Sequence, residues 1–133
     1  MIIIAKKREV VERIWDEGSD VWVHVDPRRP GVVVPEHLRG DSRLVLQVGV
    51  DMRPTPIPDL AIDDVSLRGT LTFGRVPFHV TLPWTAVYVI ANKAGDGVLY
   101  RDALPPEVDE ELRQARADVA AEEAKPGLRL VKS

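Results

Sequence analysis

The most informative segment of the 133-residue chain is residues 65–82, which read VSLRGTLTFGRVPFHVTL. Apolar side chains alternate with polar ones, and the apolar positions are Val65, Leu67, Leu71 and Phe73, with Gly69 among them. Gly74-Arg75 interrupts the alternation as a tight turn. The alternation then resumes with Val76, Phe78, Val80 and Leu82 and ends at Pro83. A period of two predicts half-buried strands. The segment therefore predicts two antiparallel strands joined by a tight turn.

The same period recurs in short segments on both sides of this pair. The further predicted strands are residues 21–25, 32–34, 44–50, 85–91 and 98–100. Proline and glycine separate them, and the spacings are too short for crossover helices, which disfavours a doubly wound α/β fold. The sequence thus predicts a mostly β domain, a small antiparallel β-sandwich or partly open barrel.

A helix is predicted before the strands, over residues 5–17. Its apolar stripe is Val10, Val11, Ile14 and Trp15, the spacing of one helical face. Gly18 is suited to end the helix, because glycine takes the left-handed conformation at low cost. The stripe either packs on its own domain or pairs with a second copy of itself.

Two segments do not have the strand pattern. Residues 51–64 carry Pro54, Pro56 and Pro58, which stiffen the chain toward polyproline II, as a connection in the fold or as one wall of a groove. Residues 107–123 favour helix by composition, but their apolar stripe is thin. We expect an exposed or fraying helix there, or a disordered linker.

The net charge of −3 is unevenly distributed. Residues 1–101 hold 13 basic and 13 acidic groups, residues 102–123 carry a net −6, and residues 124–133 carry +3. The division predicts a neutral domain over 1–101, an acidic linker over 102–125, either helical or disordered, and a basic, apolar tail over 126–133. A neutral body gives no electrostatic reason to expect nucleic-acid binding.

The chain contains no cysteine, which excludes a disulfide scaffold, a Cys-zinc site and a thiol nucleophile. Its longest apolar runs span only a handful of residues, too few for a membrane-spanning helix. The first four residues are too short for a signal-peptide core. We expect a cytoplasmic protein.

Catalytic constellations are missing from the sequence. The histidines His24, His37 and His79 lack metal-ligand spacing, and we expect His24 and His79 on the solvent faces of strands. Asp63-Asp64 is better explained as a turn before a strand than as paired carboxylates. We expect no enzyme, no cofactor and no metal. Binding is therefore the class of function that remains. Small sheet proteins with an exposed edge can bind an extended peptide by strand addition.

Several segments, in order, resemble one adaptor family. They are residues 30–35 (PGVVVP), 44–48 (LVLQV), 73–77 (FGRVP), 80–83 (VTLP) and 127–132 (GLRLVK). In this order they resemble SspB, the stringent starvation protein B family, which enhances the specificity of the ClpXP protease. The similarity covers about residues 20–100 and resumes at 126–132.

The resemblance implies a peptide-binding domain that forms a homodimer through its N-terminal helix. Such a domain binds the ssrA degradation tag of stalled translation products in a hydrophobic groove. A linker then joins it to a short motif that docks on the N-terminal domain of ClpX. These roles belong to protein quality control and proteolysis, and they involve neither a membrane nor a nucleic acid.

The resemblance also assigns residues. The groove maps to Val48, Gly49, Val50, Met52, Leu71, Phe73, Gly74 and Val76. The ClpX-docking motif maps to Leu128, Arg129, Leu130, Val131 and Lys132.

Tethering would make delivery effectively intramolecular. A coil of about 25 residues spans on the order of 25–30 Å, which corresponds to a roughly millimolar effective concentration. The alternative is a stand-alone peptide- or RNA-binding small barrel with no protease partner, whose tail is incidental.

Overall fold

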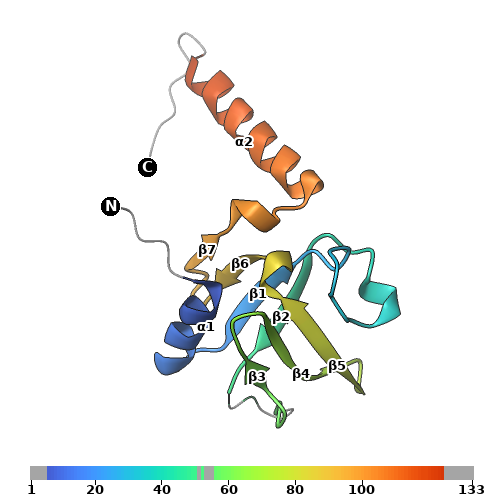
Figure 1. Ribbon diagram of the computed structural model, residues 1–133. Helices are drawn as coiled ribbons and strands as arrows, with labels where there is room; N and C mark the ends of the chain where they lie inside the picture. Colours follow the sequence, from blue (N-terminus) through green and yellow to red (C-terminus); the bar gives the residue numbers. More distant parts are fainter. Residues whose placement is uncertain (1–5, 51, 53–55, 125–133) are drawn as a thin grey trace.

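The computed structural model describes residues 6–50, 52 and 56–124 (Figure 1). Its helices are α1 (Lys7–Asp16) and α2 (Pro106–Ala124), with short 3-10 helices η1 (Glu36–Leu38), η2 (Trp84–Ala86) and η3 (Arg101–Ala103). Its strands are β1 (Val21–Val25), β2 (Leu44–Val48), β3 (Ala61–Ile62), β4 (Ser66–Phe73), β5 (Val76–Pro83), β6 (Val87–Ala91) and β7 (Gly97–Leu99).

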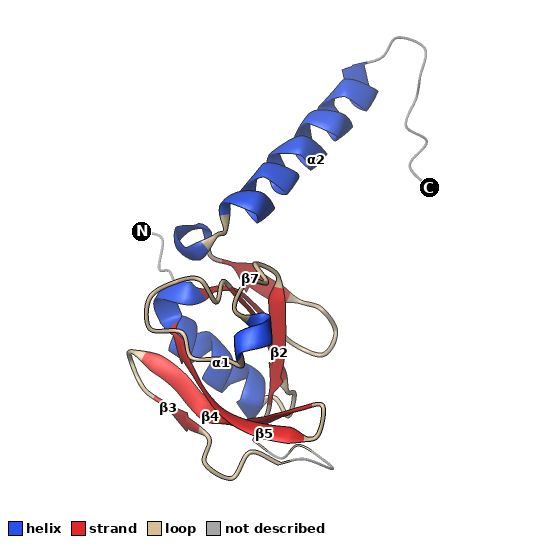
Figure 2. Cartoon of the chain, turned by 90° about the vertical axis from the view of Figure 1, so that its right-hand side faces the viewer, coloured by secondary structure: helices blue, strands red, loops and turns tan. Residues whose placement is uncertain are grey.

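The strands form two antiparallel sheets. Sheet A has the order β2-β1-β6-β7, and sheet B has the order β3-β4-β5. Figure 2 shows sheet B below sheet A, with α1 packed in the angle between them. The predicted fold class, mostly β and antiparallel with a helix at each end, is confirmed. Within the described residues the sheets do not join into a closed barrel.

Most of the strand residues in the core are positions that the alternation predicted, but Val65, which was predicted on the buried face, is 72% exposed. Val21, Val23 and Val25 of β1 are fully buried. They join one cluster with Leu44, Leu46, Val48, Leu67, Leu71, Val80 and Leu82 from the neighbouring strands. Each fully buried Val or Leu contributes roughly 1.5–3 kcal/mol of hydrophobic free energy, so this cluster is the main source of stability.

Helix α1 packs on its own domain, which was the first of the two expected alternatives. Val11 and Ile14 are buried in the core, and Val10 and Trp15 pack against it. The indole Nε1 of Trp15 donates a hydrogen bond of 3.1 Å to the carbonyl oxygen of Val48. The helix ends as predicted, because Gly18 takes a positive φ of 86°.

A two-residue turn joins β4 to β5. Gly74 and Arg75 both have positive φ, 55° and 73°, the pattern of a type I′ hairpin turn. Phe73 therefore lies opposite Val76, and the register continues to Ser66 opposite Pro83. The predicted strands and the turn between them are confirmed.

Some predicted strands are shorter than expected. Residues 32–34 form only a bridge from Val33 to Thr81, because Pro30 and Pro35 flank them and end the extended segment. Strand β2 ends at Val48, so Val50 lies beyond the sheet. Residues 84–86 form η2 before β6 begins, and β7 is shifted one residue toward the N-terminus relative to the prediction.

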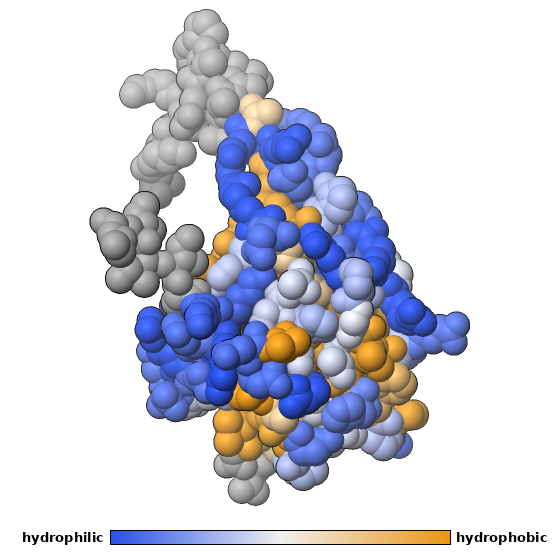
Figure 3. All heavy atoms as spheres, viewed as in Figure 1, coloured by the Kyte–Doolittle hydropathy of each residue, from blue (hydrophilic) through white to orange (hydrophobic). Residues whose placement is uncertain are grey.

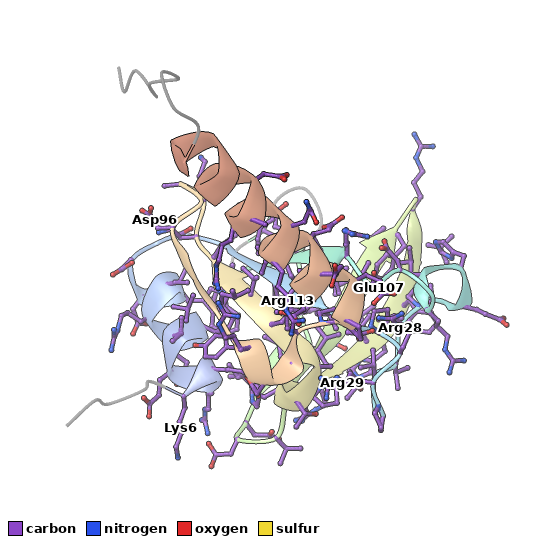
Figure 4. All side chains as sticks on the ribbon, turned by 90° about the horizontal axis from the view of Figure 1, so that it is seen from above. Lys6, Arg28, Arg29, Asp96, Glu107 and Arg113 are labelled. Carbon is purple, nitrogen blue, oxygen red and sulfur yellow. The ribbon has the colours of Figure 1, made fainter. Side chains whose placement is uncertain are left out.

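Residues 106–124 are helical, which selects one of the two forms left open by the sequence. Pro106 occupies the first helical position, where its missing N–H costs nothing. The guanidinium of Arg28 holds Glu107 through two hydrogen bonds of 2.5 and 2.8 Å (Figure 4). Arg43 pairs with Glu111. These ion pairs attach the start of α2 to the body, and the rest of the helix projects away from it (Figure 1).

Among the described residues, no helix combines the length and the apolar character needed to cross a membrane.

Gly69 should be required for the packing of the proline-rich segment on sheet B. A Cβ at this position would lie 2.7 Å from Cγ2 of the buried Ile57. We expect Gly69→Ala to destabilise the protein by about 1–3 kcal/mol, as overpacking usually does. Thermal or urea unfolding measures this change.

Gly40→Ala is the matched control, because a Cβ at Gly40 meets no atom within 4 Å. It should leave the free energy of unfolding nearly unchanged. Equal stability of the two variants would contradict the packing described for Ile57.

Candidate functional site

The first half of the predicted groove lies at the end of β2. Val48 and Gly49 are buried, and a Cβ on Gly49 would lie 1.9 Å from Oδ1 of Asp20, so a larger residue there would require the Asp20 side chain to move. Met52 is half-buried against the core. Val50 is 66% exposed and lines a cavity of about 230 Å³ with Trp15 and the loop that follows α1. Of these four residues, Val50 is the one most open to a ligand.

The second half lies at the hairpin end of β4 and β5. The apolar face of this hairpin starts inside the core and gradually leaves it. Leu71 is buried, Phe73 is half-buried, and Val76 is 62% exposed. Gly74 is exposed in the turn. The hairpin therefore extends past the core and presents part of its apolar face to solvent.

Phe78 belongs to the same face, although the sequence did not single it out as a site residue. It lies opposite Leu71 and lines a cavity of about 400 Å³. The other lining residues are Val32, Val33, Val34, Glu36 and Arg39. Figure 3 shows apolar side chains gathered on the flank of the molecule toward the β4–β5 hairpin. The alternation of Val76 with Phe78 was the signal that could have identified this residue.

Among the described residues, one backbone edge of β5 is largely unpaired beside this cavity. Thr81 exchanges both backbone hydrogen bonds with Val33, each 3.0 Å long, on the side away from β4. In an antiparallel strand every second residue points its backbone groups to the same side. His79 and Pro77 therefore direct theirs to this edge, toward the turn. The edge offers one N–H and two carbonyl oxygens, because proline has no N–H.

The opposite edge, on β4, is occupied at Thr70 and Arg68. The Asp59 carboxylate accepts hydrogen bonds from the backbone N–H and the hydroxyl of Thr70, 2.8 and 2.7 Å long, and lies 3.1 Å from Nδ1 of His79. Chiefly the Thr70 hydrogen bonds lower the pKa of Asp59 to about 2. Because Asp59 occupies this edge and β3 pairs beyond it at Arg68, the open edge of sheet B is that of β5.

Asp59, His79 and Thr70 do not form a catalytic triad. The carboxylate and the hydroxyl both approach Nδ1 of the imidazole. A triad needs them on opposite ring nitrogens, so that the histidine can move a proton from the hydroxyl. Within the described residues, no cluster of three potential metal ligands occurs.

The histidines and the aspartate pair are now placed. His79 is exposed on its strand, as predicted. His24 is half-buried, because it packs edge-on against Tyr88, with ring centroids 5.9 Å apart, and burial lowers its pKa. Asp63 accepts hydrogen bonds from the backbone N–H groups of Val65 and Ser66, which confirms the turn before β4.

The structure thus brings the predicted groove residues to two places, the end of β2 and the hairpin of sheet B. Val48 and Leu71 share one core, and Met52 and Phe73 pack against it. The predicted docking motif, Leu128 to Lys132, lies outside the described residues.

No protein-family model matches the chain, and no match was found among curated proteins.

The pKa of Asp59 should rise when Thr70 is replaced by alanine, because the hydroxyl hydrogen bond is lost. The carboxyl is ionised more readily in the folded state, so its contribution to stability is complete above about pH 4 and lost as the pH falls toward 2. Carboxyl ¹³C NMR titration measures the pKa in wild type and in Thr70→Ala. Thr72→Ala, on the same strand face, is the control and should leave it near 2.

Proposed function

We propose that this chain is a peptide-binding adaptor without enzymatic activity, which captures ssrA-tagged or similarly tagged proteins and tethers them to ClpX for degradation by ClpXP. The resemblance to SspB suggests the tag and the partner. One observation carries the binding role: the β4–β5 hairpin combines an exposed apolar face with an open backbone edge on β5.

A tag peptide in extended conformation would pair with β5 between the turn and Thr81. It would accept one hydrogen bond from the N–H of His79 and donate to the carbonyl oxygens of His79 and Pro77. Every second side chain of the peptide would then lie on the face of the sheet that carries Phe78 and Val76. Main-chain pairing supplies affinity in this mode, and the pockets under alternate side chains supply sequence preference.

Delivery would depend on α2. A helix of 19 residues is about 28 Å long, so the end of α2 lies well away from the groove. The ion pairs of Arg28 and Arg43 set the direction in which α2 leaves the body. The docking motif follows α2 in the sequence, so a tag in the groove and ClpX at the motif would be kept apart at a separation set by the helix.

We further propose that the adaptor works in the cytoplasm as a homodimer, as the resemblance implies. In this chain the apolar stripe of α1 is already packed in its own core. Contact through α1 would therefore use its charged face, and such a dimer should weaken as salt increases.

Tag binding should weaken when a charge is introduced at the hairpin. We expect Val76→Asp to lower the affinity for a fluorescent ssrA peptide at least tenfold, with little loss of stability because Val76 is mostly exposed. Val50→Asp should also weaken binding if the end of β2 contributes to the groove. Fluorescence anisotropy measures both affinities.

Val98→Asp is the matched control, because Val98 is an exposed valine on β7 of the other sheet. It should leave the affinity unchanged. If Val76→Asp binds the ssrA peptide with wild-type affinity, the β4–β5 hairpin is not part of the binding site.

Deleting residues 126–133 should separate binding from delivery. The truncated chain should bind the ssrA peptide as the full chain does, because the groove is intact, but it should no longer enhance degradation of a tagged substrate by ClpXP. The degradation rate at low substrate concentration is the measurement. Undiminished enhancement would contradict the tether.

The stand-alone alternative predicts a different result. Salt-dependent RNA binding together with no affinity for the tag peptide would favour an RNA-binding barrel over the adaptor.

A further inference from the structure

A second apolar site lies on the far side of sheet A, away from the proposed groove. The register places Val45, His24, Val89 and Leu99 in one row across the four strands. Val45 and Leu99 are 42% and 40% exposed. Burial lowers the pKa of His24, which favours its neutral form. The row forms an apolar strip on the outer face of the sheet.

The first turns of α2 lie over this row and leave a cleft. Val108 and Leu112 of the helix face the row across a cavity of about 400 Å³. The ion pair of Arg43 with Glu111 lies at its rim. Figure 3 shows apolar side chains along α2 toward the body. The cleft thus has apolar walls from both the sheet and the helix.

The apolar stripe of α2 continues beyond the cleft. Residues 113–118 are exposed, and Ala115 extends the line of Val108 and Leu112 along the helix. An isolated helix of this length is only marginally stable in water, so a covering segment would stabilise its outer half.

The distribution of charge in the chain indicates which segment could cover the outer half of α2. Residues 102–123 carry a net charge of −6, so pairing α2 with the α2 of a second copy would bring like charges together. Residues 124–133 carry +3 and no acidic group, and they include Leu128, Leu130 and Val131. This segment of the same chain is complementary to α2 in charge and to the cleft in apolar character.

The segment that follows α2 is also long enough to reach the cleft. From Ala124 back to Leu112 the helix axis measures about 18 Å. Six residues of extended chain, 125–130, reach about 20 Å. Pro126 cannot continue the helix without loss, so the chain can reverse directly after Ala124 and all six residues count toward this reach. Leu130 can therefore reach the level of Leu112, with Leu128 near Ala115.

We propose that residues 128–131 fold back along α2 and insert Leu128 and Leu130 into the cleft between α2 and sheet A. In an extended segment these two leucines share one side, and Arg129 and Val131 share the other. Arg129 and Lys132 lie within reach of the acidic side chains of α2. If the proposed function is right, a tail held in this way is withheld from ClpX, and ClpX must compete with the cleft for the same leucines.

Paramagnetic NMR on the full chain tests this contact. Because the chain has no cysteine, Ser133→Cys provides a single position for a nitroxide label. We expect the label to broaden the methyl signals of Leu99 and Leu112 and to leave those of Val76 unaffected. The broadening should persist on dilution and in a mixture with excess unlabelled chain, because the contact is within one molecule.

Two variants of similar size check the assignment. Leu130→Thr should abolish most of the broadening, whereas Val131→Thr, on the other side of the segment, should keep it. Absence of broadening in the parent chain would overturn the proposal, and broadening that disappears on dilution would show instead that a second copy occupies the cleft. The measurement involves neither tag peptide nor ClpX, so its outcome is independent of whether the adaptor function is right.

Discussion

The register between β4 and β5 is the constraint on which the other features depend. The turn at Gly74 and Arg75 fixes it, and a shift of one residue would turn the apolar side chains of one of the two strands to solvent. With the register set, Gly69 can accept Ile57, and the proline-rich segment is held against sheet B. Asp59 then closes the edge of β4, which leaves the edge of β5 as the open one.

The local pattern of the sequence was enough to predict the hairpin, the N-terminal helix and the class of fold. Val21, Val23 and Val25 alternate with Trp22, His24 and Asp26 because one face of β1 is buried, and a period of two is visible without any tertiary information. The shortened strands have a different cause. Prolines next to residues 32–34 limit them to one bridge, which only the partner Thr81 makes recognisable.

Long-range features could not be predicted in the same way. Ile57 is a core residue in a segment that the prolines made look like a connection, and its place depends on the missing side chain of Gly69. The direction of α2 depends on Arg28 and Glu107, which are 79 residues apart in the sequence. The predicted groove residues fall at two places because β2 and the hairpin belong to different sheets, and the sequence pattern does not assign strands to sheets.

The uneven charge of the chain fits a division of roles. A neutral body carries the open edge, and an acidic helix leads to a basic tail. The account depends most on the claim that a tag peptide pairs with β5. Residue-resolved amide hydrogen exchange, with and without a saturating ssrA peptide, tests it most directly. The account predicts that exchange of the His79 N–H slows strongly when the peptide binds. Peptide binding with unchanged exchange at His79 would contradict it.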